Sequence, residues 1–147
     1  MDLIEFEREY FNFCSEIGLR PSEVVVSSGG ALLMLGLRDS TNDLDLSIPS
    51  DTYEFQRYLL GSDKERVTEH GTFLDYNEKV SLQKLPAGIV AQVVSGVRVY
   101  SLDDLIRQKE ALIQSLDRSP LKVKQDHIDI ERLKEKRRDM TKLLLQH

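Results

Sequence analysis

Two carboxylates separated by one residue, Asp43 and Asp45, are the side chains of this sequence best suited to chemistry. Segment 43–48 (DLDLSI) alternates polar and apolar residues, which predicts a half-buried strand with both carboxylates on one face. Two carboxylates at that spacing can converge on a divalent ion such as Mg²⁺, which prefers oxygen ligands and keeps waters for substrate phosphates. The alternative is the solvated surface of an exposed strand.

A second group, Ser28-Gly29-Gly30, is separated from Asp43 by twelve residues. The valine-rich segment 23–28 predicts a buried strand, and segment 31–35 favours a helix directly after the glycines. A strand that ends in two glycines at a helix start offers backbone N–H groups to a phosphate, whereas the alternative is an ordinary tight turn. With a metal held by the facing strand, this is the layout that a phosphoryl or nucleotidyl transferase requires.

The elements that must position these residues fit one domain, because the chain has 147 residues. We expect an N-terminal helix (1–18), a sheet core (23–100) and C-terminal helices (101–147) within a single domain. The local signals follow the order helix, strand, helix, strand, helix, several strands and two helices. The predicted fold class is therefore α/β (α+β), a mixed sheet flanked by helices.

Individual elements carry their own signals. An apolar stripe along residues 3–17 predicts a helix that ends at Gly18, and Ser50 or Asp51 can cap a helix running to about residue 60. Segments 73–76 and 79–85 predict a hairpin, and 97–100 predicts a short strand. Further helices are expected at 101–116 and after Ser119-Pro120, up to residue 146.

Composition excludes several classes of protein. The formal charge is −5, so any basic footprint for nucleic acid must be local. Cys14 is the one cysteine, which rules out an intramolecular disulfide, and with three histidines the ligands are too few and scattered for a structural zinc site. The N-terminus is acidic where a signal peptide would be basic, and no apolar run suits a membrane span, so we expect a cytoplasmic protein.

Segment 28–46 (SGGALLMLGLRDSTNDLDL) resembles the signature of the polymerase-β-type nucleotidyltransferase superfamily. Within it, the segment is most similar to minimal nucleotidyltransferases and AbiEii-like toxins. Segment 80–86 looks like their third catalytic strand, and segments 100–109 and 122–133 look like their later helices. The resemblance implies a nucleotidyltransferase-like sheet and a Mg²⁺-dependent transfer of a nucleoside monophosphate from an NTP to a hydroxyl of an RNA end or a protein.

The resemblance also implies roles for particular residues. Asp43 and Asp45 would hold Mg²⁺, and the triphosphate would be bound by Ser28, Gly29, Gly30, Arg38 and Lys109. The alternative for Arg38 is a solvated loop charge, and for Lys109 an ordinary surface lysine.

One position departs from the family pattern. Active members carry a third carboxylate on a later strand, and the matching position here is Ser81, which cannot ionise. Asp75 or Glu78, in the predicted hairpin, would then have to substitute. The alternative function is a catalytically degenerate protein that binds nucleotide or a partner macromolecule, related to toxin–antitoxin systems or phage defence.

Segment 131–142 contains six basic and three acidic residues, a local charge of +3. It predicts either a patch for RNA or another polyanion, or an exposed helix face on which both signs of charge are interleaved. The segment has no aromatic residue for base stacking.

Overall fold

The computed structural model describes residues 1–146 and divides into two compact units, Met1–Tyr100 and the residues from Ser101 onward. The first unit contains a seven-stranded sheet with helices, and the second contains two helices. The element order is the predicted one, and the predicted fold class, a mixed sheet with flanking helices, is confirmed. None of the helices formed by residues 1–146 is both long and apolar enough to span a membrane.

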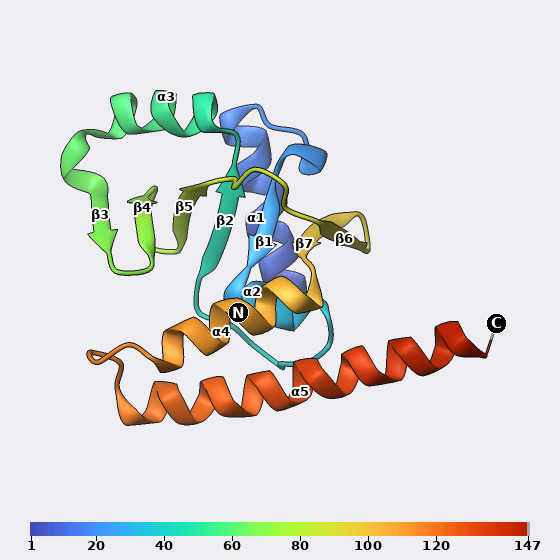
Figure 1. Ribbon diagram of the computed structural model, residues 1–147. Coiled ribbons are helices and arrows are strands. Elements are labelled where there is room, and N and C mark those ends of the chain that lie inside the picture. The colour runs from blue at the N-terminus through green and yellow to red at the C-terminus, as the bar shows by residue number, and fades with distance from the viewer. Residues whose placement is uncertain (147) are drawn as a thin grey trace. The chain divides into compact units, whose positions relative to one another are not determined.

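The sheet has the strand order β3-β4-β5-β2-β1-β7-β6 (Figure 1). Strand β1 pairs antiparallel with β2 and parallel with β7, while β2 pairs parallel with β5, so the sheet is mixed. The strands are β1 (Val25–Ser27), β2 (Leu44–Ile48), β3 (Glu65–Thr68), β4 (Gly71–Asp75), β5 (Val80–Lys84), β6 (Ala91–Val94) and β7 (Val97–Tyr100).

One face of the sheet is apolar and packs against α1 (Leu3–Ile17) and α2 (Ser28–Met34). The predicted stripe of α1 buries Phe6, Tyr10 and Phe13, and Gly18 ends the helix with φ 71°, as expected for a glycine cap. The strands contribute apolar side chains at every second position, and those that are fully buried include Val26, Leu44, Leu46, Leu74, Leu82 and Val99.

The boundaries differ from the predicted ones in several places. Strand β1 is shorter than the predicted 23–28, and α2 begins at Ser28 and not after the glycines, so Gly29 and Gly30 lie inside its first turn. Helix α3 (Ser50–Leu60) has Pro49 as its N-cap residue, so the prediction of Ser50 or Asp51 as the cap is wrong. Proline suits this position because its fixed φ leads into the first turn without a donor to satisfy. Strand β2 begins at Leu44, so Asp43 lies one residue outside it, and the helix expected at 101–116 ends at Ile113.

The second unit consists of α4 (Leu102–Ile113) and α5 (Pro120–Leu145). Ser101 and Ser119 cap these helices, since each side chain accepts a hydrogen bond from a backbone N–H three residues on. The helix starts at about residue 101 and after Ser119-Pro120 were predicted, but Ser119 was predicted only as part of a break and not as a cap. The two helices are antiparallel, because residues late in α4 pair with residues early in α5, and Asp103 pairs with Arg137.

Candidate functional site

The register of β1 and β2 places the Ser28-Gly29 turn beside Asp45. Ser27, the last residue of β1, lies directly opposite Asp45, and its Oγ donates a hydrogen bond to the Asp45 carbonyl oxygen at 3.3 Å. Ser28 begins α2 with φ 57°, which turns the chain sharply from strand into helix. Asp45 is half-buried, and its strand neighbours Leu44 and Leu46 are fully buried. The two predicted motifs are therefore adjacent in space.

Asp43 lies in the loop directly before β2 and is exposed. Strand pairing starts at Leu44, whose N–H donates to the Lys79 carbonyl at 2.8 Å. The Thr41 hydroxyl donates to the Asp43 carbonyl oxygen at 3.4 Å and so holds the loop backbone. The prediction that both acids lie on one strand holds for Asp45, whereas Asp43 belongs to the loop that leads into the strand.

The two glycines have different neighbours. A Cβ added at Gly29 would lie 2.8 Å from Arg38 Nη1 and 2.6 Å from Thr41 Oγ1, so the guanidinium of Arg38 reaches the turn at the end of β1. A Cβ added at Gly30 would lie 2.6 Å from two ring carbons of Phe6, inside the core. Gly29 thus lies against Arg38, which was predicted to bind phosphate, while Gly30 is required by packing between α2 and α1.

A row of polar side chains crosses three neighbouring strands on the face of Asp45. Ser81 of β5 lies directly opposite Asp45, in the register that the family resemblance suggested, and Asp75 of β4 lies directly opposite Ser81. Residues paired across a sheet project from the same face, so these three side chains are neighbours. Glu78 is exposed in the turn between β4 and β5, outside this row.

Arg66 of β3 completes the row and was not predicted. Its Nε donates to both carboxylate oxygens of Asp75, at 3.1 and 2.9 Å, and its Nη2 donates to Ser81 Oγ at 3.4 Å. The hydrogen bond that Arg66 donates to Asp75, together with the negative charges of Asp75 and Asp45, raises the pKa of Arg66 above its ordinary value. Arg66 lies in the short, mostly polar strand β3, and only the pairing of β3 with β4 brings it to the site.

The same face continues with neutral polar groups that the sequence analysis also missed. Ser47, two residues beyond Asp45, lies 2.6 Å from the Tyr100 hydroxyl and accepts a hydrogen bond from Gln83 Nε2 at 3.0 Å. Ser47 and Tyr100 are fully buried. The alternation that placed Asp45 on this face also indicated Ser47, whereas its partners come from distant strands.

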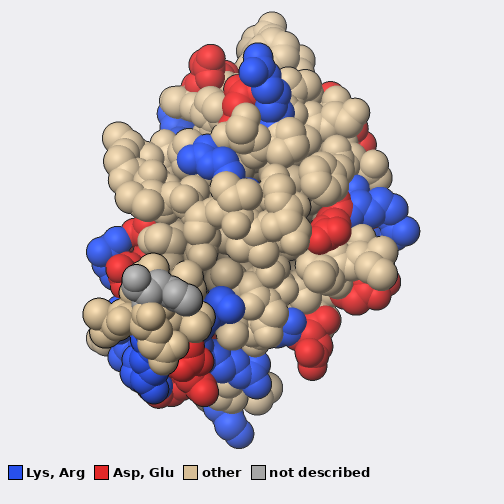
Figure 2. Space-filling model, turned by 90° about the vertical axis from the view of Figure 1, so that its right-hand side faces the viewer, with Lys and Arg blue, Asp and Glu red and all other residues tan. Residues whose placement is uncertain are grey.

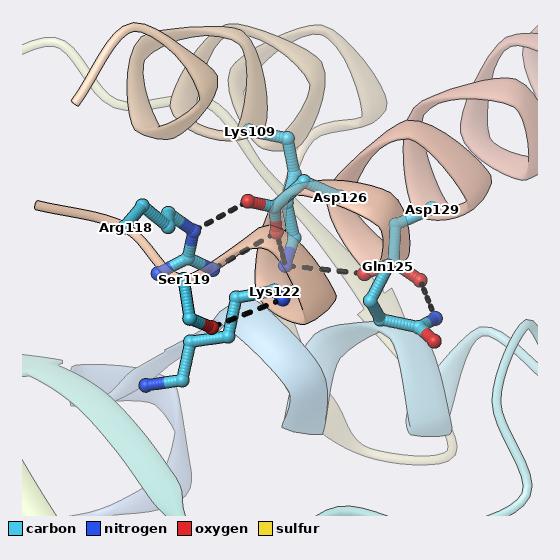
Figure 3. Close-up of polar contacts among 7 residues, drawn as sticks. All are labelled: Lys109, Arg118, Ser119, Lys122, Gln125, Asp126 and Asp129. Atoms are coloured by element: carbon cyan, nitrogen blue, oxygen red, sulfur yellow. Dashed lines mark hydrogen bonds and ion pairs between the residues drawn. The ribbon is translucent and has the colours of Figure 1, made fainter. Parts of the chain in front are cut away.

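Lys109 is buried within the helix pair of the second unit. Its ammonium lies 3.2 Å from a carboxylate oxygen of Asp126 and 3.2 Å from one of Asp129, and Arg118 donates to both oxygens of Asp126 (Figure 3). Gln125 donates to the other oxygen of Asp129 at 2.9 Å. These contacts give Lys109 a structural partner set, so the alternative of a surface lysine is wrong, and its role toward a triphosphate stays a prediction.

The basic segment of α5 lies on exposed helix surface in which acidic residues are interleaved. Arg137 donates to Asp103 at 2.8 Å, and the acidic residues Glu135 and Asp139 lie exposed on the same part of α5. Figure 2 shows Lys and Arg side chains next to Asp and Glu side chains around the C-terminal end of the chain. Its basic residues are Arg132, Lys134, Lys136, Arg137, Arg138 and Lys142.

The oxygen ligands of the site suit a magnesium ion whose remaining coordination positions are filled by waters and a substrate. Asp45 and the adjoining Asp43 supply carboxylate oxygens, and Mg²⁺ is commonly bound through one or two carboxylates together with waters and substrate phosphates. Within residues 1–146, no three His, Cys, Asp or Glu side chains come together in a metal-binding group. Asp75, the next acid in the row, is already paired with Arg66.

Neither a protein-family model nor a curated protein sequence matches the chain. Among solved structures, the crystal structure of ANT(2")-Ia in complex with adenylyl-2"-tobramycin is similar to it, with a TM-score of 0.45 and 14% sequence identity. The match covers 81% of this chain and 88% of that chain. This similarity is too distant to assign the chain to a family.

Proposed function

We propose that the chain is a Mg²⁺-dependent nucleotidyltransferase of the cytoplasm that transfers a nucleoside monophosphate from an NTP to a hydroxyl of an RNA end or a protein. The observation that supports this proposal is the pairing of Ser27 with Asp45, which brings the Ser28-Gly29 turn next to the carboxylate that we propose as a metal ligand. The sequence of segment 28–46, with its resemblance to that superfamily, supports the same function.

In this reaction the acceptor oxygen forms a bond to the α-phosphorus of the NTP while the bond between the α- and β-phosphates breaks. Pyrophosphate leaves with the electron pair of that bond, and the hydroxyl proton passes to water. The chain positions the triphosphate through Ser28, the Gly29 backbone and the guanidinium of Arg38, a planar fork that matches phosphate geometry. Catalysis of this kind depends mainly on positioning and on charge neutralisation.

Asp43 and Asp45 are the residues that would hold Mg²⁺ in this proposal. The ion supplies positive charge that neutralises the phosphate oxygens as they approach the site. Gly30 contributes through its backbone only, because its Cα faces Phe6. Lys109 has a structural role in this proposal, because its ammonium pairs with Asp126 and Asp129 between α4 and α5.

The test is transfer of label from NTPs carrying a labelled α-phosphate, with Mg²⁺ and with RNA, protein or the chain itself as acceptor. We expect transfer by the wild type and loss of transfer in Asp45→Asn, which keeps the shape of the side chain and removes its charge. Asp51→Asn, in the exposed first turn of α3, is the matched control and should transfer like wild type. Absence of transfer with every nucleotide and acceptor would overturn the proposal.

A second candidate is a protein that binds nucleotide, or a partner macromolecule as in a toxin–antitoxin pair, without turnover. It is favoured by one observation: the position opposite Asp45 is Ser81, and the nearest further acid of the row is occupied by Arg66. Calorimetry separates the two functions, because this candidate binds NTP or its partner and leaves NTP intact. Turnover of NTP would reject it.

A further inference from the structure

The charges of the polar row are divided between two halves. On one side stand Asp43 and Asp45, the acids assigned to the metal; on the other stands Asp75 with the guanidinium of Arg66 bound to it. Ser81 lies between the halves, opposite Asp45 and opposite Asp75, and accepts a hydrogen bond from Arg66. The positive charge of Arg66 therefore reaches Ser81 on β5, and β5 lies one interstrand spacing, roughly 5 Å, from β2 and Asp45.

We propose that Arg66 is the built-in cation of this site, that Asp75 positions it, and that the site takes a single divalent ion at Asp43 and Asp45. This inference rests on the proposed function, since it concerns the same site. The nearest acid beyond Asp45 is Asp75, and both of its oxygens accept from the Nε of Arg66, so it is compensated by the chain itself.

Arg66 also has the exposure that such a role requires. Its side chain is 51% exposed and that of Asp75 is 40% exposed, so an anion can approach the guanidinium without breaking the ion pair. The charge of Asp45 contributes to the raised pKa of Arg66, which agrees with the placement of both groups in one row. Arg66 thus supplies a second positive charge for phosphate oxygens, next to the divalent ion.

The test compares Arg66→Met with Asp75→Asn in a titration with Mn²⁺ alone, followed by electron paramagnetic resonance. Both variants break the same ion pair, so a purely structural pair predicts the same effect for both. An electrostatic role predicts opposite effects, since a positive charge opposes a divalent ion nearby and a negative charge attracts it. We expect the Mn²⁺ dissociation constant to fall about tenfold in Arg66→Met and to rise several-fold in Asp75→Asn.

Two controls accompany this test. Arg57→Met breaks a comparable pair, Arg57–Glu65 at 3.2 Å, with Glu65 on the other face of β3, and should leave the Mn²⁺ affinity unchanged. Arg66→Lys keeps the charge and should retain an affinity close to that of wild type. Equal shifts in Arg66→Met and Asp75→Asn, or no shift in either, overturn the inference.

Stoichiometry gives an independent measurement. Wild type should bind one Mn²⁺ per chain with a non-hydrolysable NTP, and the double variant Ser81→Asp/Arg66→Met should bind two. Two ions in wild type overturn the inference while leaving the proposed function intact. If wild type transfers no nucleotide while Arg66→Met and Asp75→Asn still shift the Mn²⁺ dissociation constant in opposite directions, the proposed function alone is overturned. A wild type that binds no Mn²⁺ overturns both.

Discussion

Two clusters in which acidic and basic side chains pair with each other differ in their access to solvent. In the C-terminal unit, the side chains of Lys109, Asp126 and Asp129 are 9%, 1% and 0% exposed, and Arg118 adds a second cation. In the sheet unit, by contrast, half of the Arg66 side chain is exposed. Equal numbers of acids and cations balance the first cluster, so it suits a structural role, whereas the second can admit a ligand.

The physical basis of this difference is the cost of desolvation. A buried charge is tolerated only with close partners, and removal of one partner leaves another charge uncompensated in a medium of low polarity. An exposed pair contributes little to stability because water and salt screen it. The four predictions below vary each region in turn, from the largest expected effect to the smallest.

Replacement of Lys109 by methionine should have the largest effect on stability. It removes the ammonium that lies 3.2 Å from the buried carboxylates of Asp126 and Asp129, and we expect the free energy of unfolding to fall by about 3–5 kcal/mol. The measurement is urea denaturation of the full chain. Lys122→Met, on the exposed surface of α5, is the control and should change stability by less than about 0.5 kcal/mol. Equal stability of the two variants would show that the buried network is not structural.

Asp45→Asn should act on binding rather than on stability. We expect Mg²⁺-dependent NTP binding, measured by calorimetry, to weaken at least about tenfold. Mutating a residue that only orients a metal ligand already costs that much metal affinity, and Asp45 would be a ligand itself. The free energy of unfolding should change by less than about 1 kcal/mol, because Asp45 is only half-buried and water still screens its charge. NTP binding equal to that of wild type would mean that Asp45 is ordinary surface.

Gly30→Ala and Gly29→Ala test the same division on two adjacent residues. The added methyl group at position 30 meets the Phe6 ring, so we expect a loss of about 1–3 kcal/mol of stability. At position 29 the added methyl group meets the ends of the Arg38 and Thr41 side chains, which can move. Gly29→Ala should therefore lower stability less than Gly30→Ala does, and lower the affinity for NTP more. Thermal unfolding and calorimetry measure the two effects, and the reverse ranking would contradict this assignment.

Ser28→Gly should have the smallest effect. Ser28 adopts φ 57°, where glycine avoids a steric cost, but glycine also loses more entropy on folding. We expect the free energy of unfolding to rise or to stay within about 1 kcal/mol of wild type, as measured by urea denaturation. A larger loss would show that the Ser28 side chain makes a contact essential for the fold.

Local patterns were sufficient to predict much of the fold and part of the site. The stripe of α1, the hairpin of β4 and β5 and the starts of α4 and α5 are encoded within a few residues, because periodicity and helix starts depend on near neighbours. Segment 28–46 likewise contained the turn and the acids, and its strand–helix–strand order made their proximity predictable.

Only the tertiary structure decided which charges meet. Arg66 reaches Ser81 and Asp75 because three strands pair in a particular register, and Lys109 is buried because α4 and α5 pack antiparallel. Gly30 lies against the ring of Phe6 from another helix, whereas Gly29 lies against Arg38 and Thr41 of the loop after α2. The sequence by itself determined the elements and the acids of the candidate site, since these follow from local propensity. Pairing between distant segments determined the environment of each charge, because that environment depends on long-range contacts that no local pattern specifies.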